Sequence, residues 1–240
     1  MRCFSCIISW VEMEKIILEE NKNCWLQNEC NHIDCDKFCL RRFKLDYLYN
    51  EAMLSNKQRA RIPLRYDNDC LDKESFEYLS TIEKNILNFV KDGGSLYIYS
   101  STTGNGKTSW AIRMIQSYLN KIWYESELTC RALFINVPRS LLAIKDNISQ
   151  KSDYVAHIKE NVLNADLVVW DEVGTKGLTQ FEHENILNLI NARIDLGKAN
   201  IYTSNLSDDE LHVAVGDRLY SRIAILSDGV ELVGSDKRAL

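Results

Sequence analysis

A segment that contains two glycines, a lysine and a threonine has the residue types that bind a polyphosphate. Gly104-Asn105-Gly106-Lys107-Thr108 follows an apolar run at 96–99 and precedes a helical pattern over 110–123. Backbone N–H groups of such a loop can surround phosphate oxygens, the lysine ammonium can neutralise the β and γ oxygens, and the threonine hydroxyl can hold Mg²⁺. The order of strand, loop and helix argues against a chance glycine-lysine turn. The sequence therefore predicts a nucleoside triphosphate site.

The loop departs from the common GxxxxGK[ST] pattern at its first position. Ser101 stands there in place of glycine. A serine keeps its backbone N–H, so we expect phosphate contacts to survive if the turn accommodates a Cβ atom.

A second apolar run, at 167–170, ends in the adjacent carboxylates Asp171 and Glu172. Such a pair is typical of a Walker B motif, in which Asp171 would belong to the Mg²⁺ shell and Glu172 would orient and polarise the attacking water. The next strand ends at Asn205, where ligands bind in open α/β sheets. This side chain is a candidate for positioning the water, or it caps the helix that begins near Ser207.

Arg218 and Arg222 are four residues apart on a predicted helix, so they share one face. Either guanidinium could reach a γ-phosphate across a subunit interface, which would make hydrolysis depend on assembly. The alternative is a surface ion pair with Asp217 or Glu210.

The elements that must position these residues alternate along the chain. Helical patterns separate the strand-like runs, and this alternation predicts an α/β fold with a parallel sheet. The runs are 96–99, 132–137, 167–170 and 201–203. A further helix over 79–90 ends at Gly93-Gly94. We place a domain boundary near Arg65, which divides the chain into an N-terminal unit, 1–65, and an ATPase domain, 66–240.

A cluster of cysteines in the N-terminal unit predicts a metal site. Four thiolates can close a tetrahedral site around Zn²⁺ and hold together a small helical domain. The four candidates are Cys24, Cys30, Cys35 and Cys39. Their irregular spacing leaves open an iron–sulfur cluster or a site in which His32 is a ligand. Cys3 and Cys6 could compete as ligands. Alternatively, some of the thiols could simply be buried as small hydrophobic side chains.

The overall composition limits the classes of partner. The chain has 240 residues and a net charge of −5, so no global field attracts nucleic acid. Residues 41–65 carry seven basic and two acidic side chains, and this stretch is a solvated helix face or a contact surface for DNA or protein. The apolar N-terminus lacks a cleavage signal, and no run reaches the length of a membrane span. We expect a cytoplasmic protein.

Residues 62–238 resemble the AAA+ ATPase domain of the DnaC/DnaI-type replicative helicase loaders, especially phage and prophage versions. The resemblance is carried by Ile62-Pro63-Leu64-Arg65-Tyr66, Leu96-Tyr97-Ile98-Tyr99, Gly104-Asn105-Gly106-Lys107-Thr108, Asp171-Glu172, Thr203-Ser204-Asn205, Gly216-Asp217-Arg218 with Arg222, and Gly234-Ser235-Asp236-Lys237-Arg238. The chain ends at Leu240, so we expect no full helical lid.

The resemblance implies an ATPase that loads the hexameric replicative DNA helicase and contacts single-stranded DNA in the bacterial cytoplasm. It implies ATP and Mg²⁺ as ligands and a homo-oligomer that assembles on ATP or on the helicase. Asn205 would be sensor 1, Arg222 the arginine finger with Arg218 beside it, and Arg238 a sensor-2-like arginine. The cysteine-rich unit would grip the helicase.

Several alternatives remain beside the loader. One is a transposition helper of the IstB type, which shares the AAA+ core, although the cysteine cluster argues against it. Another is a non-hydrolysing adaptor or inhibitor that uses ATP as a structural ligand. A small-molecule kinase fits the residues less well because the carboxylate pair and the later arginines suit assembly-driven hydrolysis. GTP is disfavoured because no Asn-Lys-x-Asp segment follows Glu172.

Overall fold

The computed structural model describes residues 24–26, 30, 39–60, 64, 72–146, 152–174, 180–234 and 236. Its centre is a five-stranded sheet in the order β2-β3-β4-β1-β5, and every pair of neighbours is parallel. The strands are β1 (Ser95–Tyr99), β2 (Ala132–Asn136), β3 (Leu167–Asp171), β4 (Ala199–Ser204) and β5 (Asp228–Glu231). The predicted parallel α/β sheet is confirmed.

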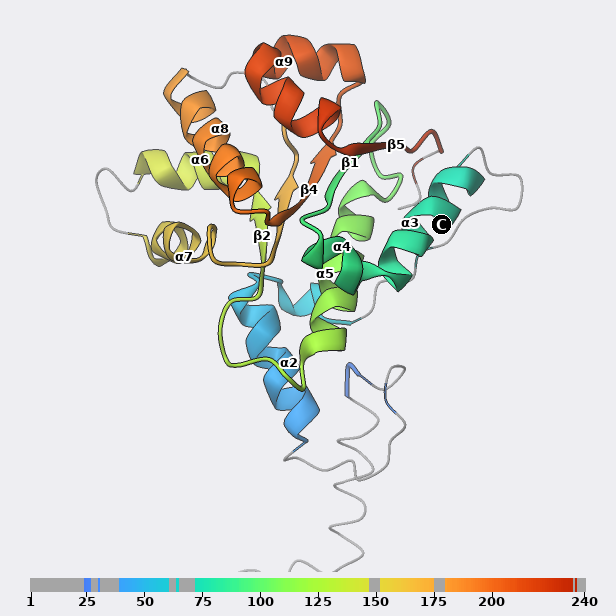
Figure 1. The fold of residues 1–240 in the computed structure, drawn as a ribbon, viewed down its shortest axis with the longest axis vertical. Helices are drawn as coiled ribbons and strands as arrows, with labels where there is room; N and C mark the ends of the chain where they lie inside the picture. Colours follow the sequence, from blue (N-terminus) through green and yellow to red (C-terminus); the bar gives the residue numbers. More distant parts are fainter. Residues whose placement is uncertain are drawn as a thin grey trace, which may run out of the picture.

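Helices cover both faces of this sheet (Figure 1). One layer contains α2 (Leu40–Glu51), α3 (Lys73–Lys84), α4 (Ile86–Lys91) and α5 (Lys107–Ile122). The other contains α6 (Val137–Asp146), α7 (Asp153–Asn161), α8 (Gln180–Asp195), α9 (Asp208–Tyr220) and the π-helix η2 (Ser221–Ile225). A short 3₁₀ helix, η1 (Asn56–Gln58), follows α2.

Alternating side chains of the strands feed two separate hydrophobic cores. In β1, Leu96 and Ile98 pack with α2 to α5, whereas Tyr97 packs with the opposite helices. In β3, Val169 and Trp170 divide in the same way. Because both faces are buried, the strands read as continuous apolar runs, which is why the sequence located four of them.

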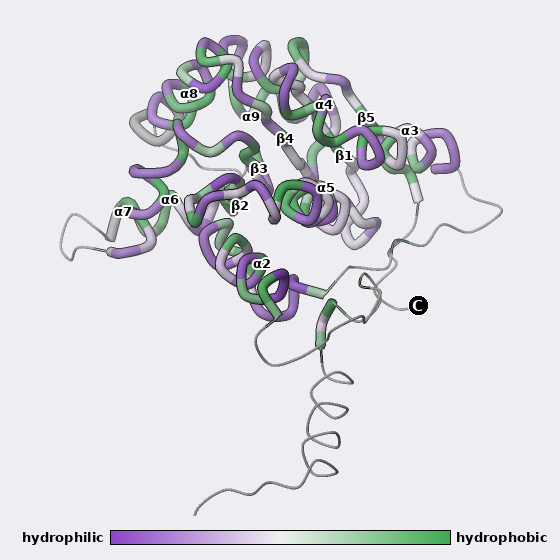
Figure 2. Tube along the Cα trace, turned by 60° about the horizontal axis from the view of Figure 1, so that its bottom comes forward, coloured by the Kyte–Doolittle hydropathy of each residue, from purple (hydrophilic) through white to green (hydrophobic). Residues whose placement is uncertain are grey.

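Helix α2 belongs to the first core although it precedes the predicted boundary. Leu45 and Leu48 are fully buried in the same cluster as β1 and α5. Figure 2 shows α2 beside β2 and α5, with hydrophobic and hydrophilic residues interspersed along it. Arg65 itself lies outside the described residues, so the boundary near it stays a prediction.

Some elements differ from the expected pattern. The helix predicted over 79–90 is two helices, α3 and α4, which meet at Asn85. Gly93 follows α4 with a φ of 67°, as the predicted helix stop requires. Strand β5 was not predicted, because only one of its four residues is buried. The described residues contain no helix that is both long and apolar enough for a membrane span.

Candidate nucleotide-binding site

The predicted phosphate loop connects the end of β1 to the start of α5. Gly104 and Gly106 have φ angles of 76° and 107°, a region that L-residues with a Cβ rarely adopt. Ser101 is not among the described non-glycine residues with a positive φ. The turn therefore accommodates serine at the position where the common pattern has glycine, and the loop keeps its backbone donors at the N-terminus of α5.

The Lys107 ammonium points into the loop. Its Nζ donates to the Thr102 carbonyl at 2.8 Å and to Asn105 Oδ1 at 3.0 Å, and the residue is only 6% exposed. These acceptors are neutral oxygens of the loop itself. Phosphate oxygens, which carry charge, would form stronger hydrogen bonds with the same ammonium.

Asn105 links the phosphate loop to the chain segment that follows β5. Its Nδ2 donates to Ser100 Oγ at 2.5 Å and to the Leu232 carbonyl, just after β5, at 2.8 Å. The following N–H groups, of Val233 and Gly234, donate to the Asp72 carboxylate at the start of α3. The shape of the phosphate loop is thus coupled to the segment that leaves β5.

The Asp171 carboxylate accepts hydrogen bonds from two hydroxyl groups, one at the start of α5 and one near the end of β4. Thr108 Oγ1 donates to Asp171 Oδ1 at 2.9 Å, and Thr203 Oγ1 donates to the same oxygen at 2.7 Å. The carboxylate is 3% exposed. Because β4 lies between β1 and β3, Thr203 stands between the loop and the carboxylate. A hydroxyl and a carboxylate at one point supply the hard oxygen ligands that Mg²⁺ prefers, so these residues fit the predicted ion.

Glu172 has an unusual backbone conformation. Its φ is 61°, in the left-handed region that is uncommon for a residue with a side chain. The Glu172 N–H donates to Thr203 Oγ1 at 3.0 Å, which holds this turn against the end of β4. A locally strained conformation of this kind is a feature of functional sites, where surrounding bonds maintain it.

Asn136, at the end of β2, contacts both carboxylates. Its Nδ2 lies 3.2 Å from Asp171 Oδ2 and 3.1 Å from Glu172 Oε2. Neither Asn136 nor the role of Thr203 was predicted from the sequence. A signal was present, because both are polar residues at the carboxyl end of an apolar strand, and these ends meet at one edge of a parallel sheet.

The three candidates beyond β4 lie on the surface. Asn205, Arg218 and Arg222 are all exposed. Arg222 Nε donates to Asn191 Oδ1 of α8 at 2.7 Å. Arg218 lies in α9 after the kink at Gly216, whose φ is 70°, and Arg222 lies in the following π-helix η2, so the two arginines are not on one regular α-helix.

Three of the four cysteines of the predicted metal site lie within the described residues. Cys24, Cys30 and Cys39 are free thiols of intermediate exposure. Cys39 is the N-cap of α2, and its Sγ accepts from the Arg42 N–H at 3.5 Å. Cys35 and His32 lie outside the described residues, as does Arg238. The N-terminal metal site and the role of Arg238 therefore stay predictions.

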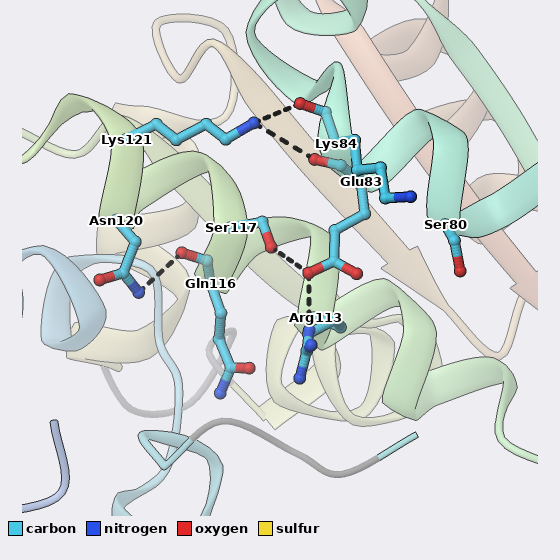
Figure 3. A pocket seen from close by; sticks show the side chains of 8 residues that line it. All are labelled: Ser80, Glu83, Lys84, Arg113, Gln116, Ser117, Asn120 and Lys121. Carbon is cyan, nitrogen blue, oxygen red and sulfur yellow. Dashed lines mark hydrogen bonds and ion pairs between the residues drawn. The ribbon is translucent and has the colours of Figure 1, made fainter. Parts of the chain in front are cut away.

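A separate polar concavity of about 440 Å³ lies between α3 and α5 (Figure 3). Glu83 accepts from Arg113 at 2.7 Å and from Ser117 at 2.6 Å, so much of the charge in its lining is paired internally. All of its α5 residues lie beyond the helix's first turn. This concavity is distinct from the phosphate loop.

Comparisons with known proteins agree with this geometry. A sequence model described as IstB-like ATP binding protein matches residues 71–228. The structure of the DnaC helicase loader is similar, with a TM-score of 0.58 and 17% identity over 74% of this chain and 99% of that chain. The DnaI structure has a TM-score of 0.53 and 17% identity over 74% and 88% of the two chains.

AMPPCP-bound DnaA from Aquifex aeolicus has a TM-score of 0.51 and 18% identity, over 70% of this chain and 48% of that chain. No protein of curated function matches the sequence. At these identities the likeness concerns the fold alone, and it confirms the predicted parallel-sheet fold of a P-loop ATPase domain.

Proposed function

Since the chain belongs to the family of IstB-like ATP-binding proteins, we propose that it is an ATPase that loads the replicative DNA helicase onto single-stranded DNA. The observation that carries the enzymatic part is the convergence of Thr108, Asp171 and Glu172 at the end of the phosphate loop. A loop that only held ATP as a structural ligand would not need a carboxylate oriented beside the magnesium ligands.

The binding step uses residues of the loop and of β3. Backbone N–H groups from Gly104 to Lys107 hold the polyphosphate, and the Lys107 ammonium exchanges its loop acceptors for phosphate oxygens. Thr108 and Asp171 hold Mg²⁺, which when bound neutralises charge that develops on the phosphate oxygens.

The hydrolytic step depends on Glu172. Its carboxylate accepts a hydrogen bond from the attacking water and polarises it, while Asn136 and Thr203 hold the carboxylate and its backbone in place. Asn205 orients the same water from the end of β4.

The arginines make turnover depend on assembly. Arg222, with Arg218 beside it, lies on the surface of α9 and η2 and approaches the γ-phosphate of a neighbouring subunit. Arg238 acts as a sensor-2-like arginine. The active form in this proposal is a homo-oligomer that assembles on ATP or on the helicase.

The proposed partner surface is the N-terminal unit, 1–65, with Zn²⁺ or an iron–sulfur cluster held by Cys24, Cys30, Cys35 and Cys39. Support comes from α2, where Leu40 and Phe43 are 56% and 63% exposed beside basic side chains. Large apolar side chains at the surface of a helix are suited to a protein contact. The likeness in fold to the DnaC helicase loader, over 74% of this chain, supports the loading function and not the N-terminal unit in particular.

A second candidate is a transposition helper, which the match to the IstB-like family model favours directly. It would use the same ATP site and would bind a transposase and DNA. The two candidates differ in their partner and not in their chemistry.

The deciding experiment is light scattering during size-exclusion chromatography of the full chain mixed with the host's replicative helicase. The mixture is run with ATP and without nucleotide, and the run with ATP is repeated with the variant Lys107→Ala in place of wild type. A stable complex that is lost when residues of the 1–65 unit are changed, for example Phe43→Asp, supports the loader. Co-elution with the transposase and not with the helicase would support the transposition helper.

A further inference from the structure

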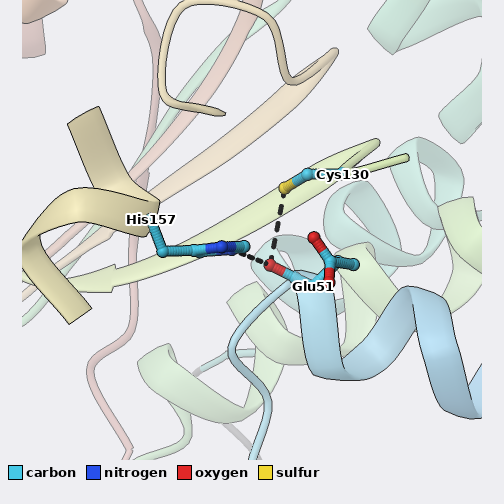
Figure 4. Close-up of side chains that lie close together, drawn as sticks. All are labelled: Glu51, Cys130 and His157. Carbon is cyan, nitrogen blue, oxygen red and sulfur yellow. Dashed lines mark hydrogen bonds between the residues drawn. The ribbon is translucent and has the colours of Figure 1, made fainter. Parts of the chain in front are cut away.

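Three side chains with different metal-binding atoms meet where α2 ends against the sheet (Figure 4). They are Glu51, the last residue of α2, Cys130, just before β2, and His157 of α7. The carboxylate, thiol and imidazole atoms all lie within 4.8 Å of one another. The three residues come from distant parts of the chain, so the fold and not a local turn brings them together.

The burial of these residues leaves one side of the cluster accessible. Cys130 is 7% exposed, whereas Glu51 and His157 are of intermediate exposure. An ion can therefore enter from the side of the carboxylate and imidazole and meet a sulfur atom that is held inside. Water can complete the coordination on the same side.

We propose that Glu51, Cys130 and His157 form a Zn²⁺ site. Sulfur, nitrogen and carboxylate oxygen are the three donor types that bind this borderline-soft ion in proteins. A cluster that served only to pair the Glu51 carbonyl would not need a thiol, an imidazole and a carboxylate together, because any hydrogen-bond donor could pair with that oxygen. The site is separate from the four N-terminal cysteines and does not depend on the proposed loading function.

Without an ion, the thiol and the imidazole share one acceptor. Cys130 Sγ lies 3.4 Å from the Glu51 carbonyl oxygen, and His157 Nε2 lies 2.8 Å from the same oxygen. The thiol also lies 3.3 Å from the Ala132 carbonyl oxygen. Burial raises the pKa of the Cys130 thiol to about 12, so the sulfur is protonated and a poor nucleophile. Zn²⁺ binding forms a Zn–S bond, and the thiol proton passes to the buffer.

The histidine has a polar neighbour on its other side. His157 Nδ1 lies 3.3 Å from the Asn161 amide, one turn along α7. A ligand histidine usually has a partner of this kind at its second nitrogen, which fixes the orientation of the ring. When Nε2 binds the ion, the proton moves to Nδ1, and the Asn161 amide must turn to accept it, which gives up the hydrogen bond that its Nδ2 donates to the His157 carbonyl at 2.9 Å.

The bound ion would fasten α2 to the ATPase core. The next carbonyl, of Ala52, already accepts from the Phe134 N–H of the edge strand β2 at 2.9 Å. Glu51 is thus held next to a direct backbone link between α2 and the sheet. Zn²⁺ at this point would add a link to α7 and would stabilise the docked position of the helix.

The test measures metal binding by the full chain after removal of metal under reducing conditions. Wild type is compared with Cys130→Ala, His157→Gln and Glu51→Gln, and His212→Gln is the matched control because its imidazole pairs with Asp217 on α9. Zn²⁺ is counted by elemental analysis after gel filtration, and Co²⁺ is added in parallel as a spectroscopic probe. Any contribution of the four N-terminal cysteines is common to all variants and cancels in the comparison.

We expect wild type and His212→Gln to bind one more equivalent of metal than Cys130→Ala, His157→Gln and Glu51→Gln. Cys130→Ala should also lose the thiolate-to-Co²⁺ charge-transfer absorption of one sulfur, whereas His157→Gln changes the ligand-field bands. Equal metal content in wild type and the three ligand variants would overturn the proposal. If Cys130→Ala fails to fold, His157→Gln and Glu51→Gln decide the outcome, because neither residue is in the buried core.

Discussion

The side-chain amide of Asn136 donates to the Glu172 carboxylate over 3.1 Å, from a strand that is not part of the phosphate loop. Asn136 and Asp171 are register partners in the ladder between β2 and β3. The amide therefore reaches Asp171 and the next residue, Glu172, from the same position. This contact links the orientation of the proposed water-polarising group to β2 and to α6, which begins at the following residue.

Asn136→Ala should lower the ATP turnover rate about tenfold while nucleotide affinity stays nearly the same, because the general base loses its orientation but the loop is intact. Steady-state hydrolysis and the affinity of a fluorescent ATP analogue measure the two effects. Asn136→Gln is the matched control, since it retains the amide group but displaces it. Equal losses of affinity and turnover would instead indicate that Asn136 supports the nucleotide site as a whole.

Glu172→Gln should reduce hydrolysis by about 10²-fold or more and leave ATP binding intact, because the amide cannot accept the water proton. Lys107→Ala should remove both binding and hydrolysis. Single-turnover hydrolysis and equilibrium binding of radiolabelled ATP distinguish the two variants. If Glu172→Gln has full helicase-loading activity, the non-hydrolysing adaptor becomes the better description.

Thr203→Val removes the hydroxyl that joins the Asp171 oxygen to the Glu172 N–H, with little change in shape. We expect a higher Mg²⁺ requirement for hydrolysis and a loss of about 1–3 kcal/mol in the free energy of unfolding, since buried partners lose a hydrogen bond. Asn205→Ala changes an exposed side chain and should not alter stability. Magnesium titrations and urea unfolding are the measurements.

The variants Thr203→Val and Asn205→Ala also show which of the two residues acts on the attacking water. If Asn205→Ala reduces hydrolysis and leaves the Mg²⁺ requirement unchanged, Asn205 acts on the water as the sequence predicts. If only Thr203→Val reduces hydrolysis, the functional polar residue of β4 is Thr203.

The sequence predicted the parts of the site whose signal is local. The loop from Gly104 to Thr108 and the pair Asp171-Glu172 each occur at the end of an apolar run, so a short window identifies them. Asn136 has the same setting, but a single polar residue after a strand is common and becomes informative only when the strand order is known. Strand order depends on long-range packing, which no window of sequence contains.

The prediction of strands from the sequence was limited in the same way. Both faces of β1, β3 and β4 are buried, and their composition identified them as strands. Strand β5 is mostly exposed and pairs only with β1 at the edge of the sheet. Its position is determined by distant contacts, among them the bond from Asn105 to the Leu232 carbonyl. The sequence could not separate this edge strand from a loop.

Asp166 gives a prediction for the pH dependence of stability. Burial opposes its ionisation, but hydrogen bonds from Arg131, Lys198 and Tyr118 lower the pKa of Asp166 below its usual value of 3.8. A carboxyl whose pKa is lower in the folded protein stabilises it above the unfolded pKa, and this contribution is lost as the pH falls through the folded value.

Asp166→Asn should therefore destabilise the protein by about 1–3 kcal/mol at neutral pH, where charged hydrogen bonds are replaced by neutral ones. The difference from wild type should shrink below about pH 4 as Asp166 in the wild type becomes protonated. Urea unfolding at several pH values measures it. A difference that does not depend on pH would mean that the effect comes from packing and not from the charge.

Arg222 is exposed on its own subunit, so its proposed role can be tested by mixing two inactive variants. Arg222→Ala keeps a complete nucleotide site but lacks the guanidinium, whereas Glu172→Gln binds ATP and still presents Arg222. If the arginine acts across an interface, Arg222→Ala alone should lose about 10³-fold or more in turnover and Glu172→Gln alone about 10²-fold or more, and the mixture should recover a substantial fraction. The same mixing with Arg218→Ala shows which of the two arginines is required. A mixture as inactive as its components would place Arg222 in the site of its own subunit or in a purely structural contact with Asn191.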